Sequence, residues 1–382
     1  MSPAQPPRAS RAAQRVGLWP LVLAALTTVP SAAQTSPDDE AREPRVPSGL
    51  AAVWRVDGRK LDQRDSAWSV AAFSTDGKLV GISDDSGTRV FRVRDGALVR
   101  MLPAPFSTGQ FAYSLAISAN GLAAIGRVGG VEVFALDGAA VPARYHCAGA
   151  CGPVSAAAFS PNGKWLAFQA ARGALEPTPG LVSVVDLGAG GVVAELEASA
   201  TRTKVAFAAD GRALFAANVT RVDESGTFGL RSWVTTGWRR VRDLPGVAVP
   251  KGTIGPYALN ESVAAYQRDG RLELRRLVSG ELVWAVPLAP PLAPPALDAA
   301  LGSSPMRLDL VAFSRDLVLS FESPEARDEQ GAIVLRRLAD GETIAMYDVA
   351  GVSALALAPD GGAFLYSTGA GRTYTVLARV PR

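Results

Sequence analysis

The stretch Ala158-Phe159-Ser160-Pro161-Asn162-Gly163-Lys164-Trp165-Leu166-Ala167 decides the fold of this 382-residue chain. An apolar segment ends at Phe159, a short polar turn follows, and a second apolar segment begins at Trp165. Asn-Gly and Asp-Gly between apolar segments predict a β-hairpin, because Gly, Asn and Asp adopt positive φ at low cost. We therefore expect a two-residue turn that joins the first two strands of a sheet.

The same form occurs seven times along the chain. The last large residue before each turn is an anchor, and the anchors are Phe73, Ile117, Phe159, Phe207, Tyr257, Phe313 and Leu357. Successive anchors lie 42 to 56 residues apart, which is close to the period of a four-stranded propeller blade. A second recurrent turn, as at Asp95-Gly96, precedes a further short strand in each unit. The repeat predicts an all-β protein, a seven-bladed β-propeller of four-stranded antiparallel blades.

The last blade needs an outermost strand from elsewhere. The sequence ends just after an apparent third strand at 374–380, and the segment Val53–Leu61 is expected to supply the fourth and close the ring. Val53–Val56 also resembles a third strand, so the register of this closure stays open.

The stretch quoted first resembles WD40-type and related bacterial repeat propellers, and the resemblance covers roughly residues 50–382. It implies the propeller architecture rather than any one activity. The chain has no Gly-His or Trp-Asp dipeptide and a single histidine, His146, so it lacks the Asp-His-Ser/Thr-Trp tetrad of regular WD40 blades.

The first residues have the order of a secretory leader. Arg8, Arg11 and Arg15 precede an apolar run and a small-residue cleavage site ending at Ala33. We expect a signal peptide over 1–33, a flexible linker over 34–48 and the propeller over 49–382, in the periplasm or outside the cell. An uncleaved anchor is the alternative, but Pro20 interrupts a run that is short for a membrane span. No stable membrane insertion is expected after cleavage.

Charge argues against nucleic acid as a partner. The leader holds three arginines and no acid, so the remaining chain has 36 acidic residues and as many basic ones. Binding to a phosphate backbone needs clustered cations, and no basic run with interleaved aromatic residues follows the leader.

Binding residues are expected on one face of the ring. Tight turns gather on the face that holds the connections from first to second and from third to fourth strands. Longer loops gather on the other face, and variable loops on a rigid scaffold are where proteins usually bind partners. Charged residues of these loops are the candidate binding residues, with solvated loop surface as the alternative: Arg172, Glu176, Arg221, Asp223, Glu224, Glu322, Glu325, Arg327, Asp328 and Glu329.

The chemistry available to the chain is limited. Cys147 and Cys151 are expected to form a local disulfide in an oxidising compartment. No further Cys or His except His146 remains to complete a metal site, and no catalytic or cofactor motif is present. The sequence therefore favours a non-catalytic scaffold that binds a protein, peptide or other ligand, without a cofactor. The alternative is a lactonase-type or hydrolase-type propeller with a central divalent metal.

Overall fold

The computed structural model describes residues 47, 49–57, 70–84, 87–103, 112–138, 143–147, 151–172, 181–197, 203–218, 220–221, 227–248, 254–260, 262–277, 279–288, 306–324, 330–368 and 374–381. The predicted leader and nearly all of the predicted linker lie outside these residues. The described residues form β-strands and their connections, without a helix.

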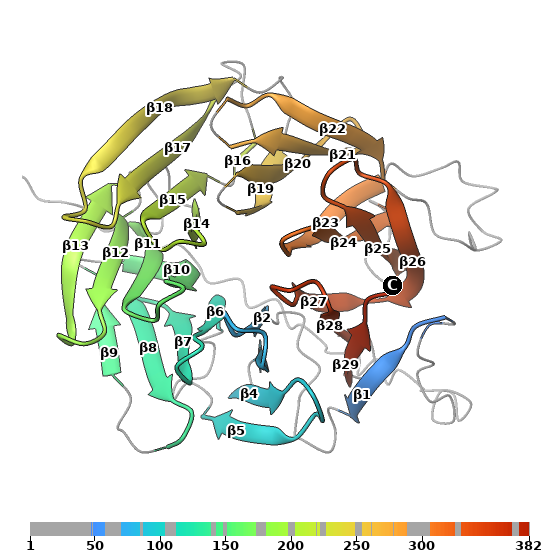
Figure 1. The fold of residues 1–382 in the computed structure, drawn as a ribbon, viewed down its shortest axis with the longest axis horizontal. Helices are drawn as coiled ribbons and strands as arrows, with labels where there is room; N and C mark the ends of the chain where they lie inside the picture. Colours follow the sequence, from blue (N-terminus) through green and yellow to red (C-terminus); the bar gives the residue numbers. More distant parts are fainter. Residues whose placement is uncertain are drawn as a thin grey trace, which may run out of the picture. The chain divides into compact units, whose positions relative to one another are not determined.

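The strands form seven antiparallel sheets, which are the blades (Figure 1). Blade 1 contains β2 (Val70–Phe73), β3 (Leu79–Asp84), β4 (Gly87–Arg92) and β5 (Leu98–Leu102); blade 2 contains β6 (Ser114–Ile117), β7 (Leu122–Arg127), β8 (Gly130–Ala135) and β9 (Ala143–His146). Blade 3 contains β10 (Cys151–Phe159), β11 (Trp165–Arg172), β12 (Leu181–Asp186) and β13 (Gly191–Glu197); blade 4 contains β14 (Thr203–Phe207), β15 (Ala213–Asn218), β17 (Thr227–Val234) and β18 (Arg240–Ala248).

Blade 5 contains β19 (Ile254–Leu259), β20 (Val263–Arg268), β21 (Arg271–Arg276) and β22 (Leu282–Pro287), with the short β16 (Thr220–Arg221) as a fifth strand. Blade 6 contains β23 (Met306–Phe313), β24 (Leu317–Pro324), β25 (Gln330–Arg337) and β26 (Thr343–Ala350). Blade 7 contains β27 (Val352–Leu357), β28 (Ala363–Thr368), β29 (Tyr374–Arg379) and β1 (Ala52–Asp57). The predicted all-β propeller of seven blades is confirmed.

Strand β1 closes the ring. It pairs antiparallel with β29, so that Arg55 lies opposite Val376 and Asp57 lies opposite Tyr374. Trp54 of β1 donates a hydrogen bond from Nε1 to the carbonyl oxygen of Val93 in blade 1, over 3.0 Å. The strand near the N-terminus therefore completes the last blade and contacts the first one, which confirms the predicted closure and settles its register.

The core lies between neighbouring blades. On one side of blade 1, Val80, Ile82 and Phe91 are buried against Leu365 and Leu377 of blade 7. Similar apolar layers lie between the other pairs of neighbouring blades, for example between blades 3 and 4 around Trp233. Each blade is thus apolar on both sides and depends on two neighbours for burial.

The repeated turn is longer than the predicted two residues. Ser160 N donates to Trp165 O over 2.9 Å, and Gly163 N donates to Ser160 O over 2.8 Å, so four residues lie between the paired ends. Only Gly163 has positive φ, at 67°, whereas Asn162 caps the turn by accepting hydrogen bonds from Ser160 Oγ and Lys164 N. Asn and Asp recur in this turn as hydrogen-bond acceptors, not as residues of positive φ.

The fifth anchor is displaced by two residues. Strand β19 ends at Leu259, not at Tyr257, and Asn260 follows it. Asn260 Oδ1 accepts hydrogen bonds from Ser262 N and Val263 N, over 2.8 and 2.9 Å. Like blade 6, this copy lacks the glycine that marks the turn in the other five blades, and Asn260 caps a shorter turn in its place.

A β-bulge interrupts the pairing of the outermost strand in six blades. Each bulge adds one unpaired residue near the same end of the strand, and each extra residue is β-branched: Val53, Val99, Val193, Val241, Val283 and Ile344. Bulges twist an edge strand and make it a poorer template for another chain. The repeated bulges therefore protect the outer edges of the blades.

In blades 7 and 5 the residue after the bulge is a tryptophan that covers a turn of the next blade. Trp54 and Trp284 hold equivalent positions, and Trp284 Nε1 donates to Leu338 O of blade 6 over 2.8 Å. A Cβ atom on Gly96 would lie 2.6 Å from the Trp54 ring, and one on Gly341 would lie 2.9 Å from the Trp284 ring. Both glycines also have positive φ. Glycine is therefore required where an outer tryptophan closes over the neighbouring turn.

Candidate functional site: the loop-rich face

We call the face with the connections from second to third strands, together with the links between blades, the loop-rich face. Its connections differ between blades. In blades 1, 2 and 5 the connection between the second and third strands has two residues. The pairs that close these hairpins are Asp84 with Gly87, Arg127 with Gly130 and Arg268 with Arg271. In blades 3, 4, 6 and 7 the connections span 173–180, 219–226, 325–329 and 369–373. The long connections are thus restricted to particular blades.

Most predicted binding residues lie outside the described part of the chain. Those residues are Glu176, Asp223, Glu224, Glu325, Arg327, Asp328 and Glu329. The backbone of Arg172 is described at the end of β11, where it pairs with Cys151. Arg221 lies in β16, opposite Ile254.

Strand β16 was not expected from the sequence. It belongs to the connection within blade 4, but it pairs antiparallel with β19, the innermost strand of blade 5 (Figure 1). The connection therefore brings the backbone of Arg221 beside the inner edge of the neighbouring blade.

Glu322 differs from its expected place in a surface loop. It lies within β24, its side chain has no exposed surface, and it forms an ion pair with buried Arg336. Arg336 Nη2 donates to Glu322 Oε2 over 3.2 Å, and Arg336 Nη1 donates to Ser320 Oγ over 3.0 Å. Strand β24 continues to Pro324, so the loop begins later than predicted. A carboxylate neutralised inside the sheet is unsuited to direct contact with a partner.

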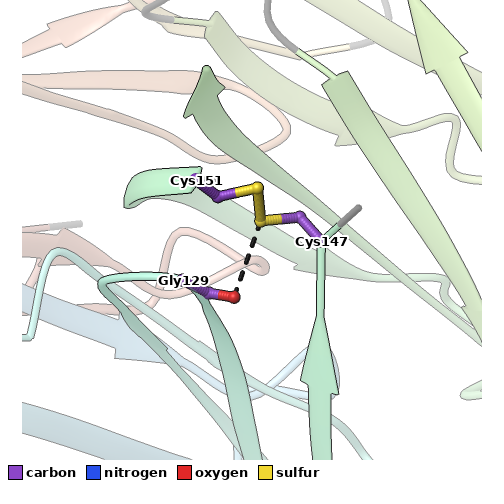
Figure 2. Close-up of a disulfide and its surroundings, with 3 residues drawn as sticks. All are labelled: Gly129, Cys147 and Cys151. Atoms are coloured by element: carbon purple, nitrogen blue, oxygen red, sulfur yellow. Dashed lines mark hydrogen bonds between the residues drawn. A yellow bond between two sulfur atoms is a disulfide. The ribbon is translucent and has the colours of Figure 1, made fainter. Parts of the chain in front are cut away.

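Cys147 and Cys151 are bonded to each other at the loop-rich end of blades 2 and 3 (Figure 2). The two-residue hairpin tip of blade 2 lies between the two ends of this small loop. Gly129 O accepts a hydrogen bond from Cys147 N over 3.4 Å, and Gly129 N donates to Gly152 O over 3.0 Å. Val128 also pairs with Pro153. The link between the blades therefore holds the hairpin tip in place.

Oppositely charged side chains five residues apart recur beside the two-residue hairpins. Arg89 Nη1 lies 2.9 Å from Asp84 Oδ2 in blade 1, and Arg127 Nε lies 3.2 Å from Glu132 Oε2 in blade 2. In blade 5, Arg268 Nε lies 2.8 Å from Glu273 Oε1. The first residue ends the second strand and the partner is the third residue of the next strand, so the hairpin brings the two together.

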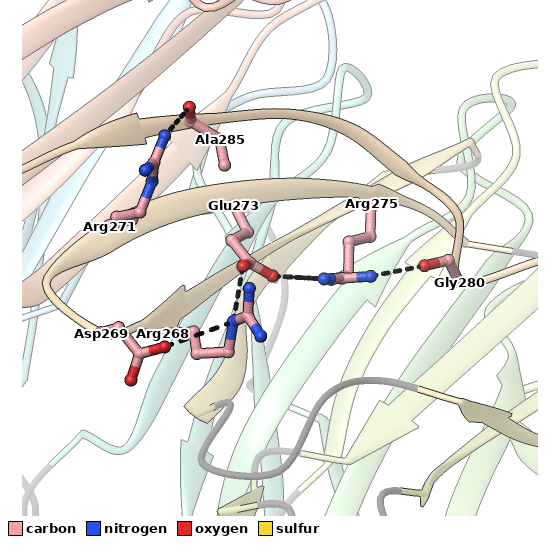
Figure 3. A network of polar contacts seen from close by, with 7 residues as sticks. All are labelled: Arg268, Asp269, Arg271, Glu273, Arg275, Gly280 and Ala285. Atoms are coloured by element: carbon pink, nitrogen blue, oxygen red, sulfur yellow. Dashed lines mark hydrogen bonds and ion pairs between the residues drawn. The ribbon is translucent and has the colours of Figure 1, made fainter.

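The pair in blade 5 extends into a network (Figure 3). Fully buried Glu273 also accepts a hydrogen bond from Arg275 Nε over 2.8 Å, and Arg275 Nη1 donates to Gly280 O over 2.9 Å. Tyr266 lies opposite Glu273 on the neighbouring strand. Burial raises the pKa of the Tyr266 hydroxyl, so the hydroxyl stays protonated. Sequence reasoning missed these pairs, although Arg127-Val128-Gly129-Gly130-Val131-Glu132 and Arg268-Asp269-Gly270-Arg271-Leu272-Glu273 share a visible pattern.

The centre of the ring offers few carboxylates. Asp309 is the only acidic residue in the seven innermost strands as the structure describes them. Within the described residues, no three His, Cys, Asp or Glu side chains lie close enough together to hold a metal ion. The same part of the chain contains no helix with the length and apolarity to cross a membrane.

Comparisons with known proteins identify the architecture. No family model matches the sequence, and no curated protein matches it. A chain from the structure titled "Crystal Structure of Mitotic Checkpoint Complex" is similar with a TM-score of 0.57 and 14% identity, covering 90% of this chain and 97% of that one. At this identity the likeness concerns the fold alone. The fold is that of a WD40-like β-propeller.

Proposed function

We propose that this protein is an exported, non-catalytic scaffold that binds a protein or peptide through its loop-rich face. The difference between the two faces is the main support. One face repeats the same hydrogen-bonded turn in five blades, as in the equivalent bonds from Gly77 N to Ser74 O and from Gly163 N to Ser160 O, and has a shorter turn in the other two. The other face varies from two-residue hairpins to long charged connections on the same rigid scaffold. Variation on one face of a repeated framework is typical of a recognition surface.

A protein partner also agrees with the comparison. The structurally similar chain comes from a structure whose title names a complex. The charged loop residues, with Glu176, Asp223, Glu224, Glu325, Arg327, Asp328 and Glu329 among them, mix both signs. Such a mixture suits the polar rim of a protein interface better than a nucleic-acid surface.

The two ends of β11 allow a matched test. A photoreactive residue at Arg172 lies on the loop-rich face, whereas one at Lys164 lies in the tight turn just before the same strand. We expect irradiation in the native envelope or culture medium to attach one discrete protein to the chain from position 172 and not from position 164. Equal capture from both positions, or capture from 164 alone, would show that the wrong face has been chosen.

Export rests on the leader pattern. If the leader is removed after Ala33, N-terminal sequencing of the exported protein should begin at Gln34. A chain recovered from the cytoplasm with its first residues intact would refute the export proposal.

A further inference from the structure

The hairpin tips of blades 2 and 5 have equivalent backbones but differ at three of six positions, and two of these differences, Val128 against Asp269 and Gly130 against Arg271, change the charge. Arg127 and Arg268 end the second strands, and Gly129 and Gly270 have positive φ of 84° and 67°. Between them stands Val128 in blade 2 and Asp269 in blade 5. Glu132 and Glu273 hold the same place on the following strands. The two blades can therefore be compared residue by residue at this tip.

Blade 5 balances its charges within the blade. Arg268 and Arg275 both contact Glu273, so two guanidinium groups share one buried carboxylate. Asp269 Oδ2 lies 3.8 Å from Arg268 Nε and supplies a second negative charge at the hairpin tip (Figure 3). Two cations and two anions therefore meet in this network, which runs from the hairpin tip to Gly280 in the turn at the other end of β21. Arg271, a further arginine at the tip, donates to Ala285 O instead.

Blade 2 also has two cations beside its glutamate, but the second, Arg144, lies on the fourth strand, where blade 5 has Ala285, and only one anion is present among the described residues. Glu132 Oε2 lies 3.2 Å from Arg127 Nε, and Glu132 Oε1 lies 2.9 Å from Arg144 Nε. Where blade 5 has Asp269, blade 2 has uncharged Val128. The segments that flank blade 2, at 104–111, 139–142 and 148–150, contain no acidic residue. No second carboxylate reaches this cluster from the described residues.

The shortage of negative charge leaves part of the Arg127 side chain without a hydrogen bond in the described part of the chain. Its Nη1 is buried and has no hydrogen-bond acceptor among the described residues. Burial lowers the pKa of Arg127, Glu132 opposes that shift, and the charge of Arg144 adds to it. Two like charges with a single carboxylate between them form a site where a further anion is favoured.

The cluster is accessible and its backbone is well held. The side chain of Arg144 is 55% exposed, and Val128 is 46% exposed. The other large hydrophobic residues exposed to this degree in the described part lie on outermost strands, so Val128 is distinctive in standing on the loop-rich face. Hydrogen bonds on both sides of Gly129 and the nearby disulfide fix its position.

We propose that Arg127 and Arg144 form a subsite for an Asp or Glu side chain of a bound peptide segment, with Val128 contacting an apolar side chain next to that acid. The partner supplies the carboxylate that Asp269 supplies in blade 5. This inference rests on the proposed peptide-binding function and names the chemistry of one part of that surface. Arg144 makes the direct contact with the acid, because its side chain is exposed. Arg127 is buried beside Glu132 and adds positive charge to the site without touching the acid.

An array of C-terminally amidated random peptides, probed with the protein lacking residues 1–33, tests the subsite. We expect the bound peptides to share an acid beside an apolar residue. For the best such peptide, Arg144→Glu and Val128→Asp should each weaken binding about tenfold or more, because each places a negative charge beside the acid. Arg144→Lys should retain part of the affinity. Arg94→Glu is the control, since it makes the same charge change at an exposed site on the opposite face.

The outcomes separate the subsite from the wider function. Bound peptides without an acid, or an acidic peptide whose affinity is unchanged by Arg144→Glu, would overturn the subsite and leave a peptide-binding propeller. An array without any specific binder would overturn both. Thermal unfolding of each variant should match the unaltered protein, and a variant that unfolds early is replaced by Arg144→Gln, for which weakened binding supports the subsite and unchanged binding overturns it.

Discussion

Replacing Arg336 by alanine should lower the free energy of unfolding by about 3–5 kcal/mol, because the buried Glu322 carboxylate would lose the guanidinium with which it forms an ion pair. Both side chains are almost completely removed from water. Ser320 donates a hydrogen bond to Glu322 Oε1 but carries no charge to replace the guanidinium. Chemical denaturation of the protein lacking residues 1–33 measures the effect.

The adjacent residue provides the control. Arg337 is exposed and pairs with Asp340 and Glu342 in the turn after β25. Arg337→Ala should change stability little, because exposed ion pairs contribute weakly. The double variant Glu322→Leu with Arg336→Met should recover most of the lost stability, since an apolar pair can replace a buried ion pair. Equal losses for Arg336→Ala and Arg337→Ala would contradict the buried position of the pair.

The sequence predicts the ring because the signal for it repeats. Each copy of the turn after anchors such as Phe73 or Phe159 is weak alone, but a shared period excludes most other folds. The closing strand follows from counting strands. The bulges at residues such as Val193 and Ile344 could not be predicted, because a bulge depends on the register between two strands and leaves no composition signal.

The candidate site was harder to predict for a different reason. Glu322 stands before a charged run and looks like loop sequence, but its burial depends on Arg336, which lies 14 residues away and is paired only once the sheet forms. The pair Arg127 and Glu132 had a usable signal, since opposite charges flank a glycine turn. The sequence alone does not show that Val128 holds the place of the acidic Asp269, because this equivalence depends on comparing the hairpins of blades 2 and 5 in the structure.

Removing β1 should have the largest effect on the whole ring. A chain that begins at residue 58 would leave the edge of β29 unpaired and would lose the Trp54 ring from its place on Phe91, 5.4 Å between centroids. Trp54→Ala alone should cost about 3 kcal/mol, because a large ring leaves a partly buried site. Loss of the complete strand should abolish the cooperative unfolding transition seen by circular dichroism. Addition of a peptide of residues 49–60 should restore it, whereas a scrambled peptide should not.

The arrangement of all seven blades, and with it the identity of the loop-rich face, depends on the pairing of β1 with β29. A cysteine pair at Arg55 and Val376 tests that pairing directly, because residues opposite each other in antiparallel strands lie within disulfide reach. Mass spectrometry of the unreduced, digested protein should find the linkage between positions 55 and 376, and none between 55 and a cysteine at Met101 on the outer strand of blade 1. A free cysteine at 376, or a linkage of position 55 to another blade, would contradict the closed ring.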